Sequence, residues 1–156
     1  MPMDRSRYPT NWKEISERIR FQRAQNRCEQ CGVHNHTWIV RSMEDGSQFV
    51  YLDEETLGFK NTEGQRLHPD QIPESILANP KTTWVILTVH HIGVDKPDGT
   101  LGDPCDKMDC RDENLIALCQ RCHLLADMPI NIPARKHTRH VHKHQRIQAA
   151  GQQEMF

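Results

Sequence analysis

The stretch ENLIALCQRCH, residues 113–123, places a short apolar strand pattern directly before two cysteines. Residues 114–118 read as a strand, and a helix is predicted to begin within residues 119–127. The spacing of Cys119 and Cys122 lets both thiolates reach one ion from a tight turn. A second pair with the same spacing occurs near the start of the chain, in CEQC at residues 28–31. Two such pairs complete a tetrahedral site, so we predict a structural zinc ion held by Cys28, Cys31, Cys119 and Cys122.

The two cysteine pairs are separated by residues 32–118, which is longer than the usual gap in zinc sites of this kind. The strands between them must therefore return the chain to its start. A redox role for either pair would need a thioredoxin-like βαβ context, which the sequence lacks. Cys105 and Cys110 lie in a loop rich in Gly, Asp and Pro, either as free thiols or as ligands of a second ion.

Two adjacent histidines, His90 and His91, end the strongest strand pattern of the chain, TTWVILTVHHI at residues 82–92. Successive side chains of a strand point to opposite faces. One histidine can therefore turn toward a metal ion while the other faces water. Histidine accepts a proton near neutral pH, which suits a general base.

The combination of VHHI, ENLIALCQRCH and the earlier CEQC resembles the zinc-stapled branch of the HNH endonucleases, which are ββα-metal nucleases common in phages and prophages. The resemblance covers residues 28–31 and about 84–127. It implies an α+β fold with a ββα-metal core, a four-cysteine zinc site, flanking N- and C-terminal helices and a β-hairpin insertion. The expected single domain is divided into a basic helix (1–27), an insertion (32–82), the core (83–127), and a basic helix with tail (128–156).

The resemblance also implies roles for individual residues. His91 matches the general base that activates water, and Asn114 matches the asparagine that fixes the loop and orients this base. His90 and His123 match the ligands of one divalent catalytic ion, Mg²⁺, Mn²⁺ or another. The family often has aspartate where this chain has His90, and the histidine makes the site softer and less charged. Such an ion stabilises the charge that develops at phosphorus and at the leaving 3′ oxygen.

The charged residues are unevenly distributed. Residues 1–27 carry seven Lys/Arg and three acids, and residues 128–150 carry five Lys/Arg and no acid. Two positive ends around an acidic middle predict a phosphate-binding surface, although solvated helix faces would show the same pattern. The residues predicted to contact DNA are Arg121, Arg135, Arg139 and Lys143. Histidines at 137, 140, 142 and 144 lie between the basic residues of the C-terminal segment. They belong either to a DNA-facing helix, to a metal site or to a plain solvated helix face.

The remaining elements follow from local patterns. Asn11 with Glu14 has capping-box spacing and predicts a helix from residue 12. Strands at 38–43 and 48–52 around Asp45-Gly46 predict a β-hairpin. The other expected segments are a loop at 53–70, a short helix at 72–79, a loop at 93–113 and a second basic helix at 133–151.

Hydrophobic residues make up 36% of the 156-residue chain, compared with about 45–50% in typical domains. A small core of this kind often needs a metal. The polar start and the absence of a long apolar run predict a cytoplasmic protein without a membrane span. We expect DNA as partner, other phage or defence proteins as further candidates, and a monomer or homodimer. The competing functions are an inactive zinc-stapled nucleic-acid-binding module and a zinc adaptor that does not bind nucleic acid.

Overall fold

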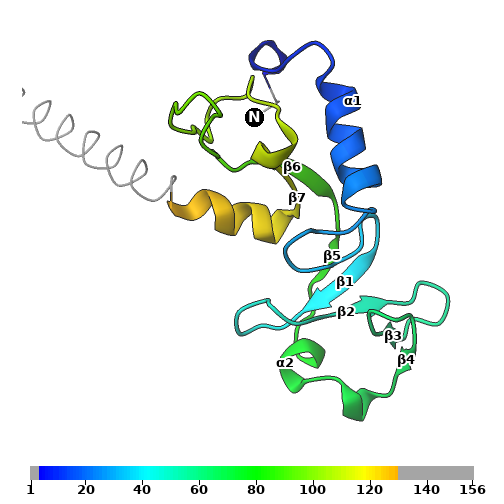
Figure 1. Cartoon of the computed structure of the whole chain (residues 1–156). Helices are drawn as coiled ribbons and strands as arrows, with labels where there is room; N and C mark the ends of the chain where they lie inside the picture. The colour runs from blue at the N-terminus through cyan, green and yellow to red at the C-terminus, as the bar shows by residue number, and fades with distance from the viewer. Residues whose placement is uncertain (1–3, 130–156) are drawn as a thin grey trace, which may run out of the picture. The chain divides into compact units, whose positions relative to one another are not determined.

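The computed structural model describes residues 4–129, and the chain divides into two compact units, Met1–Cys122 and His123–Phe156. The first unit contains two antiparallel sheets and several short helices, so the fold is of mixed α+β class (Figure 1). Within residues 4–129, no helix is both long and apolar enough to cross a membrane. The predicted helix at 133–151, with Arg135, Arg139 and Lys143, lies outside the described residues.

A five-stranded sheet in the order β4-β3-β2-β1-β5 lies in the segment between the two cysteine pairs, and its strands fall between residues 38 and 84. Strands β1 (Trp38–Arg41) and β2 (Phe49–Leu52) form the expected hairpin, with Val40 opposite Val50. Gly46 in its turn has a φ of 67°, which glycine adopts without strain. The strands of this sheet that extend the hairpin are β3 (Phe59–Lys60), β4 (Arg66–Leu67) and β5 (Thr82–Trp84).

The prediction of a plain loop at residues 53–70 is wrong, because β3 and β4 lie within it and a 3₁₀ turn at Pro69–Gln71 begins within it. Strands of two residues are too short to show an alternating pattern in sequence. The short helix is confirmed as α2 (Glu74–Leu77). Its Ile76 packs with Ile72 against Val40 and Val50, which forms the core under this sheet.

The second sheet pairs β6 (Leu87–His91) with β7 (Leu115–Cys119), in a register that runs from Leu87–Cys119 to His91–Leu115. A helix begins at Gln120, directly after β7. The single strand predicted over 82–92 is instead divided between the two sheets. Val85 and Ile86 separate its halves, and the backbone of Val85 bonds to Thr37 and His36 (2.9 Å each).

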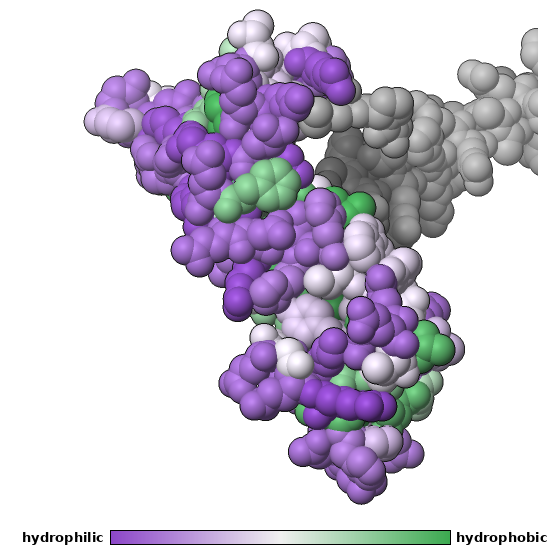
Figure 2. Space-filling model, turned by 90° about the vertical axis from the view of Figure 1, so that its right-hand side faces the viewer, coloured by the Kyte–Doolittle hydropathy of each residue, from purple (hydrophilic) through white to green (hydrophobic). Residues whose placement is uncertain are grey.

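The N-terminal helix comprises α1 (Trp12–Glu17) and a π-helical segment, η2 (Arg18–Arg23). The predicted capping box is wrong, because the Asn11 side chain makes no capping hydrogen bond. Ile19 and Ala24 pack against Leu115 and Ala117 of β7, and this contact joins the helix to the second sheet. The face in Figure 2 is largely hydrophilic with small separate apolar patches, as the low apolar content predicts.

Candidate metal centre and histidine site

Four cysteine side chains gather in the first unit, as the sequence predicts. One sulfur atom from each of Cys28, Cys31, Cys119 and Cys122 lies within 4.8 Å of the other three. Three of these residues are buried, and the Cys31 and Cys119 sulfurs are 3.7 Å apart. The donor set is that of a structural zinc site, in which sulfur ligands fill every position. The four cysteines can therefore hold a zinc ion that leaves no site open for reaction.

The local backbone explains why these thiols meet. Gly32 has a φ of 73°, and its N–H donates to the Cys28 carbonyl over 2.8 Å, which closes the first knuckle. Glu29 N–H donates to the Ala117 carbonyl over 2.9 Å, so the knuckle is attached to β7. Cys119 ends β7, and Cys122 lies in the first turn of the helix that follows. The long insertion returns the chain to this point.

The electrostatics of the cluster favour a bound cation. Hydrogen bonds from Cys119 and Cys28 lower the pKa of Cys31, whereas the same kind of bonds with Cys28 and Cys31 raise the pKa of Cys119. Burial, followed by the charge of Cys28, raises the pKa of Cys122 to about 11. Four thiolates at this separation repel one another, so a divalent cation is needed to ionise them together. Arg41 supplies part of the positive charge beside these thiolates, because its Nη2 lies 3.6 Å from the Cys119 sulfur.

Cys105 is exposed and Cys110 is half-buried, and both are free thiols. Neither belongs to a group of metal-ligating side chains among residues 4–129. Of the two alternatives for these cysteines, the described part of the chain favours free thiols.

His91 ends β6 and is only 1% exposed. The expectation that it faces water is wrong for this structure, because the Trp12 ring stacks on it at 5.5 Å between centroids and Tyr8 lies at 6.1 Å. Its Nε2 is buried and has no hydrogen-bond partner among residues 4–129, while the ring bonds to the Lys107 backbone. The donor in that bond is therefore Nδ1.

Burial is the largest cause that lowers the pKa of His91, to about 4, and the charges of Lys107 and His90 add to it. The charge of Asp109 and the hydrogen bond to the Lys107 backbone act in the opposite direction. The imidazole is consequently neutral at pH 7. A neutral ring with one nitrogen fixed and the other unpartnered is the arrangement that a proton acceptor requires.

Asn114 is fully buried and closes the loop between β6 and β7. Its Oδ1 accepts hydrogen bonds from the N–H groups of Gly93 and Val94 (2.8 Å each), and its Nδ2 donates to the Asp109 carbonyl over 2.9 Å. Both ends of the loop are thereby held together. Lys107, whose backbone bonds to His91, lies within this loop. Asn114 thus holds together the loop whose Lys107 backbone bonds to His91.

The two histidines predicted to share a catalytic ion belong to different units. His90 lies opposite Ile116 in the second sheet of the first unit. His123 belongs to the second unit, and its Nε2 is 3.6 Å from Oδ2 of Asp127, one helical turn further on. The pairing of His90 with His123 stays a prediction.

Arg121, which the sequence predicts to bind phosphate, has a further role in the structure. Its Nη2 donates to the Asp45 carbonyl over 2.8 Å, in the turn of the β1–β2 hairpin.

Sequence reasoning missed Arg41, Lys107 and Asp127. Only Asp127 carried a usable signal, since it follows His123 at the i,i+4 spacing of one helix face.

Comparison of the chain with protein-family models, curated proteins and solved structures found no match.

Proposed function

We propose that this chain is a metal-dependent DNA endonuclease of the HNH, ββα-metal type. The observation that supports this most directly is the arrangement of His91 at the end of β6, with Nδ1 held by the loop backbone and Nε2 unpartnered. The order of β6, loop, β7 and helix agrees with such a core, as does the four-cysteine cluster at the β7–helix junction.

In the proposed reaction, His91 Nε2 takes a proton from water, whose oxygen attacks the scissile phosphorus. The bond from phosphorus to the 3′ oxygen then breaks, and the 3′ oxygen takes up a proton. The products are a 5′ phosphate and a 3′ hydroxyl. A positioned general base of this kind contributes roughly 10²–10⁴-fold to the rate. Asn114 would act as a positioning residue, because its bonds fix the loop that carries Lys107.

We further propose that His90 and His123 bind one divalent ion, Mg²⁺ or Mn²⁺, with Asp127 as an additional ligand on the same helix face as His123. Such an ion supplies positive charge at the leaving oxygen. Mg²⁺ and Mn²⁺ prefer oxygen ligands, and His90 replaces the aspartate that the family often has at this position. The Asp127 carboxylate would supply an oxygen ligand in its place.

Water must reach Nε2 for this reaction, so the groups that cover His91 must shift far enough to admit a water molecule when DNA binds. The nearest rings are those of Tyr8 and Trp12. Neither ring makes a side-chain hydrogen bond to another residue within 4–129, so ring contacts and packing alone hold this cover. Its displacement therefore breaks no hydrogen bond of these two side chains.

The experiment is a nicking assay on supercoiled plasmid with Mg²⁺, Mn²⁺ and other divalent ions. We expect the wild type to convert the plasmid to open-circular or linear DNA and His91→Ala to lose this activity. His68→Ala is the matched control, because His68 is an exposed histidine far along the insertion. Equal zinc content in all three proteins shows that the fold is retained. Nicking by His91→Ala at the wild-type rate would refute the role of His91.

The burial of His91 favours one alternative, an inactive zinc-stapled module that only binds nucleic acid. In that case plasmid binding persists and no metal supports nicking.

A further inference from the structure

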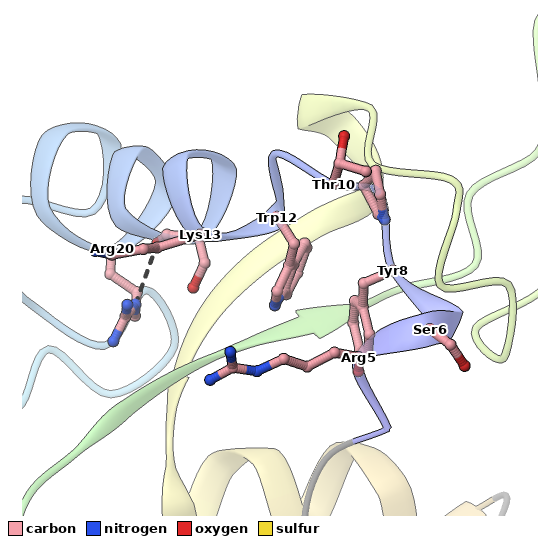
Figure 3. Close-up of a pocket in the computed structure, with 9 residues that line it drawn as sticks. Arg5, Ser6, Tyr8, Thr10, Trp12, Lys13 and Arg20 are labelled. Carbon is pink, nitrogen blue, oxygen red and sulfur yellow. Dashed lines mark hydrogen bonds between the residues drawn. The ribbon is translucent and has the colours of Figure 1, made fainter.

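A pocket of about 550 Å³ is lined by residues of the N-terminal segment, including the two rings that cover His91 (Figure 3). The 3₁₀ turn at Arg5–Arg7 and helix α1 form its walls. The side chains that give it chemical character are Arg5, Tyr8, Trp12, Lys13 and Arg20. It therefore combines cations and aromatic rings in one cavity.

The described residues that line this pocket carry a net positive charge. Three of its lining residues are cationic and none is acidic. The Arg5 and Lys13 side chains make no hydrogen bond or ion pair with any residue in the range 4–129. Within the same range, Arg20 donates only its Nε, to the Ser16 carbonyl over 3.1 Å, and its guanidinium lies 5.0 Å from the centroid of the Phe21 ring.

Two other arginines near the pocket are paired with carboxylates. Arg18 pairs with Asp112 at 2.6 Å, and Arg23 pairs with Glu29 at 2.8 Å. Both belong to η2, as does Arg20. Of the three arginines of η2, the two outside the pocket are thus paired with carboxylates, whereas Arg20 has no such partner among residues 4–129.

The aromatic wall is formed by Tyr8 and Trp12, whose ring centroids are 4.7 Å apart. In Figure 3 the Arg5 side chain extends below these rings, toward the side on which Arg20 lies. Aromatic side chains beside cations are the usual means of holding single-stranded nucleic acid, because each base stacks on a ring and each phosphate meets a cation. A base in an intact duplex is stacked between its neighbours and cannot present its face in this way.

We propose that this pocket binds an unpaired nucleotide of a DNA strand, with its base against Tyr8 and Trp12 and its phosphates on Arg5, Lys13 and Arg20. The proposal deepens the nuclease function and rests on it for the identity of the substrate. It implies that the DNA cleaved at His91 carries an unpaired stretch beside the scissile bond, as in a gap, flap or melted segment.

The first test compares Arg5→Gln with Arg7→Gln in the full chain. Both arginines are exposed and lie in the same 3₁₀ turn, but only Arg5 lines the pocket. Binding is measured with a labelled single-stranded DNA oligonucleotide and with its duplex, over a range of salt concentrations. We expect Arg5→Gln to lower the salt slope for the single strand by about 0.7 and to reduce the preference for single strand over duplex. Arg7→Gln should leave that preference at the wild-type value.

A second test uses the tryptophan signal. Stacking of a base should quench the fluorescence of Trp12 in the wild type, and Trp12→Phe should lose this change while it still binds the strand. Trp12→Leu removes the ring, and we expect it to bind the single strand about fivefold or more weakly. Because Trp12 also packs on the core, zinc content and thermal unfolding of this variant are measured alongside.

Equal effects of Arg5→Gln and Arg7→Gln on single strand and duplex would overturn the proposal, as would tighter binding of duplex than of single strand by the wild type. These readouts do not depend on cleavage. If no metal supports nicking but the pocket variants behave as expected, the nuclease function fails and the pocket assignment stands. If nicking occurs and Arg5→Gln binds single strands normally, the pocket assignment alone fails.

Discussion

Replacement of Asn114 by alanine should be among the most damaging single changes outside the metal cluster. The substitution removes three hydrogen bonds at a residue that is completely buried. The Asp109 carbonyl, whose bond is buried, would lose its partner at a cost of about 1–3 kcal/mol. The N–H groups of Gly93 and Val94 are only partly buried, so each lost bond costs nearer the ordinary net value of about 0.5–1.5 kcal/mol.

The sum is roughly 2–6 kcal/mol, which is a large share of the typical 5–15 kcal/mol for a domain. Asn61→Ala is the matched control. The Asn61 side chain also makes three hydrogen bonds, with the Gln65 side chain and with the N–H groups of Glu63 and Gln65, but they lie in an exposed turn. Water replaces them there, so we expect Asn61→Ala to cost about 1 kcal/mol or less.

The assay is urea unfolding of the zinc-loaded protein, followed by tryptophan fluorescence. We expect the midpoint for Asn114→Ala to fall far below that of Asn61→Ala. Equal midpoints would refute the reasoning, because they would show that the number of bonds, and not their burial, determines the cost. In the nicking assay Asn114→Ala should also lose activity at temperatures where it is fully folded, since the Lys107 backbone would no longer hold His91 in place.

Three further outcomes are expected. Cys119→Ser should lose the bound zinc and unfold at lower temperature, whereas Cys105→Ser, at an exposed thiol outside the cluster, should retain one zinc per chain by metal analysis. His90→Ala and His123→Ala should regain nicking at high Mn²⁺ while His91→Ala should not, and the opposite pattern would mean that the two adjacent histidines have exchanged roles. Replacement of Arg135, Arg139 and Lys143 by glutamine should flatten the salt dependence of duplex binding by about 0.9 per lost phosphate contact, and an unchanged slope would identify a solvated face.

The sequence was sufficient to predict those elements whose signals are local. The β1–β2 hairpin has a turn dipeptide between two apolar runs. The two C-x-x-C pairs have the spacing that is typical of the tight turns of zinc sites. The division of residues 82–92 between two sheets had no local signal. The contacts at this point are long-range in sequence: Asn35 Oδ1, for example, accepts a hydrogen bond from Leu87 N–H over 2.9 Å, across more than fifty residues of the chain.

The burial of His91 was also beyond sequence reasoning, for a similar reason. Alternation along a strand predicts which face a side chain takes, but it does not say what covers that face. Here the cover comes from Tyr8 and Trp12, which lie near the N-terminus, far from His91 in the sequence. In sequence, the aromatic and cationic residues of the N-terminus resemble one face of a basic helix, whereas in the structure they form a pocket beside the histidine.

The cysteine cluster and His91 are linked through a single pair of strands. Leu115 pairs with His91 at one end of β7, and Cys119 pairs with Leu87 at the other. Five residues of extended chain separate the two ends by only about 13 Å, and Asn114 directly precedes the strand. A zinc ion on Cys119 would therefore fix one end of this ladder, and Asn114 fixes the other. Because the same ladder places His91, the structural metal would support the proposed chemistry through the register of β6 and β7, without contact with the substrate.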